Sequence, residues 1–193
     1  MGGDGSKRAR GQGLAVFLAA ATLLWALVPC RGQSLHPLLN KTAPPFTIES
    51  GDGRRLTLDL LKGKVAVIFY ETRDASEKNS DIKDRLNGLY DRQEDRVRQS
   101  IVRVPVFNCS RVFWPITLVW KEGLRKHSRK VGMTLYGDWD GKMAADYQMR
   151  DRESNVVILD RAGTVRYVSS GRISEEEFHG IEELLDRLVN LEH

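Results

Sequence analysis

VAVIFY at residues 65–70 is an unbroken run of apolar side chains, rich in β-branched and aromatic residues. Such a run is typical of a central strand that is covered on both faces. We therefore expect it to be the first strand of the main sheet. The next run of this kind, IVRVPVF at residues 101–107, predicts a second strand, in which Pro105 indicates an edge position or a bulge.

Helical patterns follow each of these two strands. The first is expected to begin near Asp74, where Asp74 and Glu77 form a pair like a capping box, and to continue with one apolar stripe over residues 82–90. The second is expected from Pro115, a residue tolerated in a first helical turn, to about Gly132. Its core-facing stripe is expected at Ile116, Val119, Trp120 and Leu124. Its end is basic, which suits the negative end of a helix dipole. The pattern so far is therefore β-α-β-α.

Two hairpins are predicted outside this unit. Residues 46–49 and 56–58 flank a short turn that contains glycine, and residues 155–160 and 164–168 flank another. The second hairpin, at residues 155–168, has the clearer pattern, because both of its strands are rich in β-forming side chains. One hairpin is thus expected before the β-α-β-α unit and one after it.

A strongly amphipathic helix is predicted at the end of the chain. Ser174 and Glu177 form a capping box before it, and its apolar positions continue to Leu191. After the first hairpin the order is β-α-β-α-β-β-α, and right-handed crossovers make the first two strands parallel neighbours. This order predicts an α/β protein with a thioredoxin-like fold and an N-terminal β-hairpin extension.

The formal net charge of the 193 residues is +4, so a nucleic-acid partner has to be considered. Most of this charge lies in residues 1–32, which hold four basic side chains and one acidic side chain. The rest of the chain is nearly neutral, and its charges alternate in sign as they do on solvated helix faces. It has no basic stripe with interleaved aromatic residues, so we expect no nucleic-acid partner.

Residues 1–32 are typical of a secretory signal peptide. Basic side chains at residues 7–10 precede an uncharged apolar run at residues 13–28, and Pro29 follows. An uncleaved signal anchor is an alternative, and it would be the chain's attachment to a membrane. A lipoprotein acylated at Cys30 is another, which the proline before the cysteine disfavours.

The predicted organisation is a signal peptide at residues 1–32, a linker at residues 33–45 and the thioredoxin-like domain at residues 46–191. Export predicts a periplasmic or secreted protein. Cleavage of the signal removes Cys30 and leaves Cys109 as the single cysteine. One thiol forms no internal disulfide and carries out no dithiol chemistry.

Two blocks of sequence resemble a known family. Residues 75–79, after the first strand, and residues 153–165, around the start of the last hairpin, are similar to the bacterial periplasmic YtfJ family. The resemblance extends over about residues 40–190. It implies an exported, redoxin-type, thioredoxin-like domain whose activity is not well defined.

The chain departs from active thioredoxin-like oxidoreductases at two places. Those enzymes carry a Cys-x-x-Cys pair just after the first strand, where a helix N-terminus lowers the pKa of the thiol. Here Asp74 and Glu77 stand at these positions, and residues 31–108 contain no cysteine. The enzymes also carry a cis-proline just before the penultimate strand, but no proline follows Pro115, so a residue near Ser154 takes that place.

These departures favour a redox-inactive interaction protein. The expected binding surface combines Thr72, Arg73, Asp74 and Glu77 with Ser154, because the loops that contain them meet at one end of the sheet. The expected partner is an unidentified periplasmic or other extracytoplasmic protein. Helix capping by the two carboxylates explains their presence without any acid–base chemistry.

The alternative is a thiol oxidoreductase or peroxidase of redoxin type, with Cys109 as a lone nucleophile and an external thiol as reductant. A free cysteine is more often a small buried hydrophobe. No metal is expected, because the four histidines lack ligand spacing, and no cofactor motif is present. Residues 138–142 resemble the start of a calcium loop but lack its later glutamate, which favours a turn. Aromatic residues concentrate at residues 113–147, in an exposed insertion or in the core.

Overall fold

The computed structural model describes residues 36–190, all of which belong to one compact unit of the chain. The signal-peptide, anchor and acylation hypotheses fall outside the described residues and stay predictions. None of the helices in residues 36–190 combines the length and the apolarity that crossing a membrane requires.

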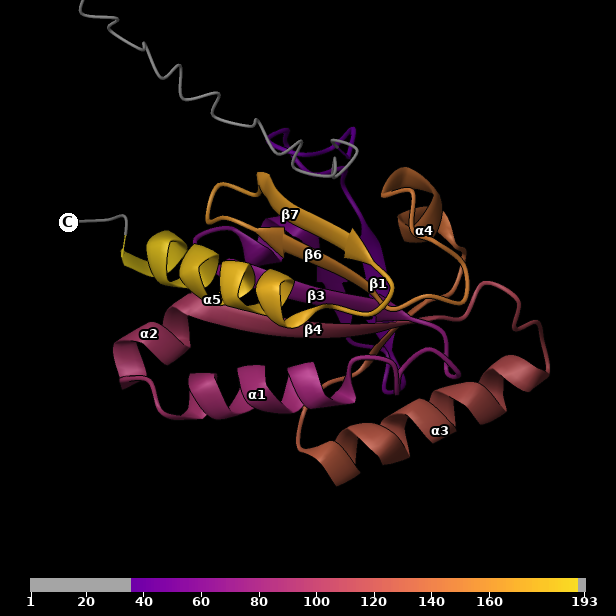
Figure 1. Ribbon diagram of the computed structural model, residues 1–193. Helices are drawn as coiled ribbons and strands as arrows, with labels where there is room; N and C mark the ends of the chain where they lie inside the picture. The colour runs from indigo at the N-terminus through magenta and orange to yellow at the C-terminus, as the bar shows by residue number, and fades with distance from the viewer. Residues whose placement is uncertain (1–35, 191–193) are drawn as a thin grey trace, which may run out of the picture. The chain divides into compact units, whose positions relative to one another are not determined.

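The described residues form a seven-stranded mixed sheet with the order β2-β1-β5-β4-β3-β6-β7 (Figure 1). The central strand, β3, pairs in parallel with β4 and antiparallel with β6. The two predicted hairpins, β1–β2 and β6–β7, lie at opposite edges. The strands are β1 (Thr47–Ser50), β2 (Arg55–Thr57), β3 (Val65–Glu71), β4 (Ile101–Asn108), β5 (Tyr136–Asp138), β6 (Asn155–Leu159) and β7 (Val165–Ser170).

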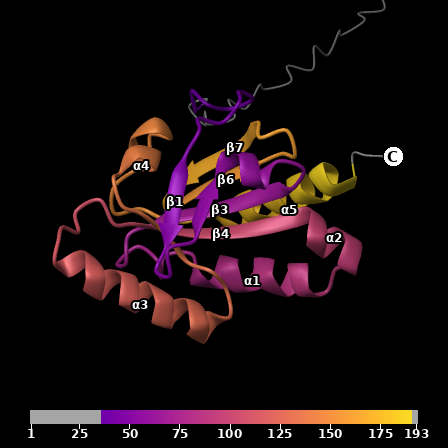
Figure 2. The same cartoon turned by 180° about the vertical axis from the view of Figure 1, so that it is seen from behind.

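Helices cover both faces of this sheet (Figures 1 and 2). The crossovers β3-α1-β4 and β4-α3-β5 run in the same direction across the sheet, so right-handed connections place α1 and α3 on one face. Helix α5 packs on that face beside α1, whereas η1 and α4 pack on the other. The helices are η1 (Leu58–Leu61, 3-10), α1 (Ser80–Asp91), α2 (Asp95–Ser100), α3 (Ile116–Val131), α4 (Lys142–Asp146) and α5 (Glu175–Asn190).

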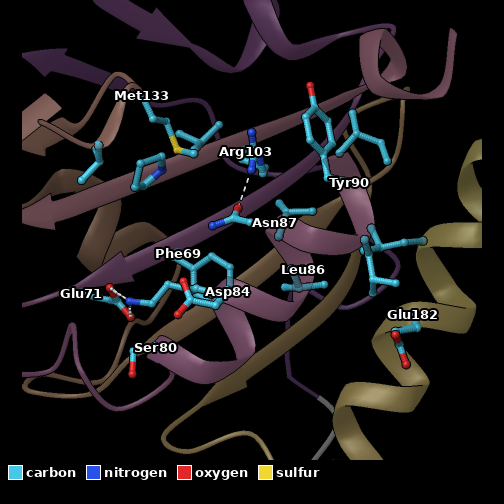
Figure 3. A pocket seen from close by; sticks show the side chains of 18 of the residues that line it. Phe69, Glu71, Ser80, Asp84, Leu86, Asn87, Tyr90, Arg103, Met133 and Glu182 are labelled. Atoms are coloured by element: carbon cyan, nitrogen blue, oxygen red, sulfur yellow. Dashed lines mark hydrogen bonds and ion pairs between the residues drawn. The ribbon is translucent and has the colours of Figure 1, made fainter. Parts of the chain in front are cut away.

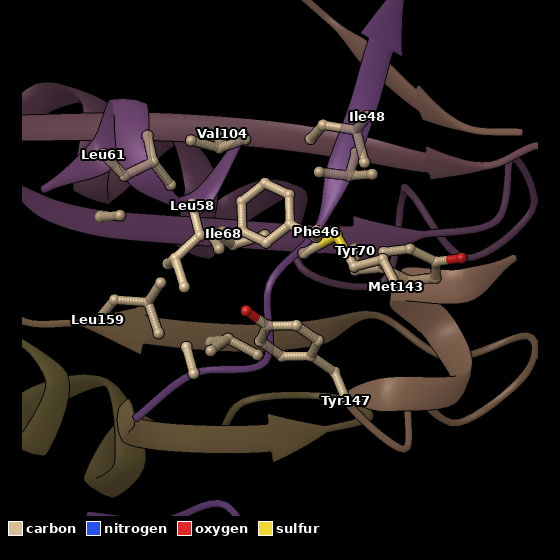
Figure 4. Close-up of a cluster of buried hydrophobic side chains, with 14 of the residues drawn as sticks. Phe46, Ile48, Leu58, Leu61, Ile68, Tyr70, Val104, Met143, Tyr147 and Leu159 are labelled. Atoms are coloured by element: carbon tan, nitrogen blue, oxygen red, sulfur yellow. The ribbon is translucent and has the colours of Figure 1, made fainter. Parts of the chain in front are cut away.

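The two sides of β3 contribute to two separate hydrophobic clusters. Ala66, Ile68 and Tyr70 face the cluster that includes Met143 and Tyr147 of the α4 region (Figure 4). The alternate positions of β3 face the cluster formed with α1 and α5. Every residue of β3 is buried, which confirms the expectation of a strand covered on both faces.

The thioredoxin-like order of elements is confirmed, together with the parallel first strand pair and both hairpins. The capping box of α5 is also present. The Ser174 backbone N–H donates to Glu177 at 2.8 Å, and the Glu177 backbone N–H donates to the Ser174 hydroxyl at 3.2 Å.

The predicted start of the first helix is wrong. Residues 72–79 form successive turns, and α1 begins at Ser80. Asn79 precedes the helix, and its buried side chain bonds to the loop after β7, donating to the Gly171 carbonyl at 2.8 Å and accepting from the Ile173 N–H at 2.9 Å. These long-range bonds fix where the helix begins, and local capping at Asp74 is overridden.

The sequence pattern also missed β5, which lies between β1 and β4. Because β5 flanks β4 only from Val106 onward, Pro105 lies where β4 has a neighbour on one side, although β4 is an interior strand. The chain does contain a cis peptide bond, Trp114–Pro115, but it precedes α3 and not β6.

Helix α3 packs against the turn of the β1–β2 hairpin rather than squarely on β4. The position of a Cβ atom on Gly51 would lie only 2.2 Å from the Lys121 carbonyl oxygen and 2.6 Å from the Arg125 nitrogen, so this approach requires glycine. Lys121 also pairs with Glu49 at 2.5 Å. The face of β4 on the side of α1 and α3 is consequently half-exposed at Arg103, Pro105 and Phe107.

Candidate functional site

A buried carboxylate lies at the carboxyl end of β3. Glu71 ends the strand, and its side chain is 5% exposed. Its two oxygens accept from the Lys83 ammonium at 2.9 and 3.1 Å, and one of them also accepts from the Ser154 hydroxyl at 2.5 Å. The charge of Glu71 is therefore compensated by α1 on one side and by the loop before β6 on the other.

The turn segment 72–79 is held against the loop before β6. Lys78 donates to the Glu153 carboxylate at 2.6 Å and to the Arg152 carbonyl at 3.0 Å. Ala75 within the segment is buried, and Lys83 donates to the Ser76 carbonyl. The two loops that the sequence placed at one end of the sheet thus lie side by side and bond to each other.

Asn155, at the start of β6, organises the second loop. Its amide nitrogen donates to the carbonyls of Arg150, Glu153 and Tyr70 at 3.0 to 3.2 Å. Its oxygen accepts from the Arg150 N–H at 2.8 Å and from the Ser170 hydroxyl at 2.7 Å. One buried amide therefore binds this loop to β3 and β7.

The predicted binding residues divide into two groups. Arg73, Asp74 and Glu77 are exposed, and none of the three forms an ion pair among residues 36–190. Ser154 is fully buried. It belongs with Glu71 and Lys83 to the group of bonded side chains that we call the Glu71 cluster. Thr72 is half-buried, and its hydroxyl has no hydrogen-bond partner within the described part of the chain.

Thr72 lines a cavity of about 290 Å³ at this end of the sheet, which Asn108, Arg111 and Asp151 also line. Arg111 and Asp151 pair at 2.9 Å. The Thr72 hydroxyl is itself buried, so the polar groups that the cavity offers are those of Asn108, Arg111 and Asp151.

A larger cavity of about 600 Å³ follows α1 and the half-exposed face of β4 (Figure 3). Glu71 and Glu77 line it at the loop end, so the loop surface continues into it. Arg103 projects into this groove, where its guanidinium lies 4.0 Å from the centroid of the Tyr90 ring and donates to the Asn87 side chain. No carboxylate of the described residues forms an ion pair with Arg103.

Cys109 follows β4 and is completely buried. Burial, with a smaller contribution from the negative charge of Asp138, raises the pKa of the Cys109 thiol to about 12. His127 lines the groove along α1, and His179 contacts Glu182 and Glu183 on α5. A thiolate is therefore disfavoured at this position.

Asp138 ends β5 and is buried beside the thiol. One carboxyl oxygen accepts from the Tyr70 hydroxyl at 2.9 Å and from the Ala144 N–H at 3.0 Å. Burial raises the pKa of Asp138 above its ordinary value of 3.8. Among the described residues no group of three or more His, Cys, Asp and Glu side chains is arranged to hold a metal ion.

Sequence reasoning missed the groups that build the site. Glu71, Lys83 and Asn155 hold both loops together, yet none was singled out. A signal for the first was present, because Glu71 is the one charged residue in a strand that is otherwise apolar. Its partner Lys83 lies twelve residues further along the chain, and only the tertiary fold brings the two together.

We expect Lys83→Met to lower the free energy of unfolding by about 2 kcal/mol, because it leaves the Glu71 carboxylate buried with one neutral donor. Denaturant unfolding measures the change. Lys62→Met, which removes the exposed partner of Asp59, is the matched control and should change stability by less than about 0.5 kcal/mol. Adding Glu71→Gln to Lys83→Met should recover part of the loss. Equal effects of the two lysine substitutions would contradict this account.

We expect Asp138→Asn to change how stability depends on pH. The raised pKa means that the folded chain holds the Asp138 proton more tightly than the unfolded chain, so this group's contribution to stability falls as pH rises from 3.8 through the raised value. An asparagine oxygen accepts the same bonds from Tyr70 and Ala144 without ionising. Unfolding measured from about pH 4 to pH 8 should therefore favour the variant increasingly as pH rises. A difference that stays constant with pH is the contrary outcome.

Solved structures of low sequence identity have the same fold. A proposed protein disulfide isomerase from Bacteroides thetaiotaomicron is 22% identical, with a TM-score of 0.58 over 78% of this chain and 89% of that chain. A proposed thiol:disulfide interchange protein DsbE from Chlorobium tepidum is 14% identical, with a TM-score of 0.58 over 79% and 98%. The pneumococcal exposed lipoprotein thioredoxin Etrx1 from Streptococcus pneumoniae is 17% identical, with a TM-score of 0.56 over 75% and 99%.

These likenesses establish the thioredoxin-like fold. No curated protein matches the sequence. The model of one bacterial family, however, matches residues 56–188, which is more than half of the chain. The resemblance noted at residues 75–79 and 153–165 is thereby confirmed. The chain belongs to the family described as "Bacterial protein of unknown function (YtfJ_HI0045)".

Proposed function

We propose that the protein is an exported thioredoxin-fold binding protein that acts without thiol chemistry. Its docking surface is formed by Arg73, Asp74 and Glu77 with the Thr72 cavity beside them. One observation carries the proposal: the turn segment after β3, where thioredoxin-like enzymes are expected to carry their dithiol, presents exposed Asp74 and Glu77 and no cysteine. Cys109 is buried elsewhere.

The position of Cys109 argues against the alternative of a single-cysteine redoxin. A nucleophilic thiol has to be accessible and at least partly ionised at neutral pH. Cys109 has no exposed surface, and both its burial and the charge of Asp138 oppose ionisation. In an active single-cysteine enzyme, by contrast, a lowered pKa and an open path to the sulfur are expected.

The architecture around the loop supports a binding role. The Glu71 cluster, Lys78 and Asn79 hold the turn segment 72–79 through side-chain bonds to three other parts of the fold. A segment fixed in this way loses little conformational entropy when a partner binds. Its outward side chains are charged and unpaired among the described residues, so they are available to a polar partner.

The groove along α1 extends this surface. Its loop end contains Glu77, and its floor is the half-exposed face of β4 with the guanidinium of Arg103. A volume of about 600 Å³ is within the range of ordinary ligand sites. An extended segment of a partner protein would have apolar contacts here and a cation for an acidic group.

The proposed location is the periplasm or the cell exterior. The basic residues and apolar run before residue 30 support export. We propose that the partner is another extracytoplasmic protein and that no cofactor takes part.

We expect Asp74→Lys with Glu77→Lys to weaken partner binding by about tenfold or more, because both substitutions reverse charge on the docking surface. Chemical cross-linking of the purified protein in an extract of extracytoplasmic proteins identifies the partner, and titration with that partner gives the affinity. Asp59→Lys reverses the charge of another exposed carboxylate, on η1, and is the matched control, which should bind as the parent does.

Cys109→Ala in the same titration separates the two functions. A binding protein keeps its affinity in this variant. Loss of partner binding in Cys109→Ala, with binding retained in Asp74→Lys with Glu77→Lys, would refute the proposal and establish the thiol as the functional group.

A further inference from the structure

The segment before α3 and its first turns form an exposed apolar projection, which we call the apolar tip. It holds most of the large apolar side chains that are exposed in the described chain. These are Phe113 (70% exposed), Trp114 (78%), Ile116 (45%), Leu118 (62%) and Val119 (72%). A concentration of this kind on a soluble domain indicates a contact surface.

The apolar side chains surround the end of the helix instead of forming one flat face. At 100° per residue, Ile116 and Val119 lie about 60° apart on one side of the helix, whereas Leu118 lies about 100° or more from both. Leu124 is the one buried side chain of α3, so the predicted core stripe over Ile116 and Val119 is wrong. The start of α3 lies at the margin of the domain, beyond the end of β4 (Figure 1). A projection with apolar groups on several sides suits insertion into a fluid phase better than packing on a rigid partner.

The charge of the same segment is strongly positive. Residues 111–131 contain six Lys and Arg and one carboxylate, whereas the rest of the described chain contains twenty Lys and Arg and twenty-three carboxylates. The carboxylate, Glu122, pairs with Arg125. Arg129 and Lys130 are exposed and form no ion pair among residues 36–190. Arg111 and Lys121 pair with Asp151 and Glu49 outside the segment, and Lys126 lies 3.8 Å from Glu122. Arg129 and Lys130 are therefore the cations that lie open to a surface of negative charge.

The cations follow the apolar tip along one face of the helix. Lys126 and Lys130 lie seven and eleven residues after Val119, which are spacings that return to the same side of a helix. The rise per residue places Lys126 about 10 Å from Val119. When the tip enters a bilayer end-on, Lys126 therefore lies about 10 Å less deep than Val119, toward the phosphate groups.

We propose that the apolar tip docks the domain on an anionic lipid surface, with Phe113 and Trp114 among the acyl chains and Lys126, Arg129 and Lys130 at the headgroups. Aromatic side chains favour this interface, and each cation close to an anionic leaflet adds attraction. A second copy of the chain is a poorer occupant, because two segments with this excess of positive charge repel each other. The proposal does not depend on the docking surface around Asp74.

The test measures partitioning of the full chain into vesicles of phosphatidylcholine alone or with about one-third phosphatidylglycerol. Three variants are compared with the parent: Phe113→Ser with Trp114→Ser, the triple reversal Lys126→Glu, Arg129→Glu and Lys130→Glu, and Leu60→Ser. Leu60 is 63% exposed on η1, far along the chain from the tip, and is the matched control. Residues 1–35 are the same in all four proteins, so differences among them report on α3.

The parent and Leu60→Ser should bind the anionic vesicles about tenfold or more tightly than the neutral ones. The triple reversal should lose that preference, and Phe113→Ser with Trp114→Ser should weaken binding to both kinds of vesicle by about tenfold or more. Circular dichroism should be unchanged, because every altered side chain is exposed. Equal binding of the tip variant and the parent would overturn the proposal. Sedimentation that shows a dimer of the parent, abolished in the tip variant, would assign the tip to a second copy and overturn it as well.

Discussion

The carboxylate of Glu71 is buried at the end of the central strand, and it stays there because Lys83 and Ser154 bond to it. An unpaired charge in this position would be strongly destabilising. The requirement joins β3, α1 and the loop before β6 in one arrangement. The turn segment that carries Arg73, Asp74 and Glu77 lies on top of this cluster, so its shape follows from how that one charge is compensated.

Much of the fold was predictable from local pattern, because the strands and helices of the core show the spacing of apolar residues that is typical of each kind of element. The apolar run at residues 65–70, the hairpin at 155–168 and the capping box at Ser174 all form as expected. Strand β5 was not predictable, since three residues with a glycine and a buried aspartate carry no alternation. The late start of α1 arises from bonds of Asn79 to a loop more than ninety residues away, which no local signal contains.

The position of the candidate site was predictable from the sequence, but the contacts that hold its two loops together were not. Adjacent strand ends bring the two loops together, as the topology requires. They are held together, however, by buried polar side chains whose bonding partners are distant in the sequence or belong to another element. Ser154 and Glu71, for example, are 83 residues apart. The groove beside them depends on α3 packing against Gly51, a close contact that is visible only in the folded chain.

A domain that acts without a reactive thiol requires an inert Cys109, and the rate at which Cys109 is alkylated measures this property. The measurement uses the chain with Cys30→Ser, so that Cys109 alone reacts, and compares native with denatured protein across pH. Burial and the raised pKa predict native alkylation about a thousandfold slower than in denaturant, limited by opening of the fold. Fast native alkylation with an apparent pKa below about 8.5 would contradict the account.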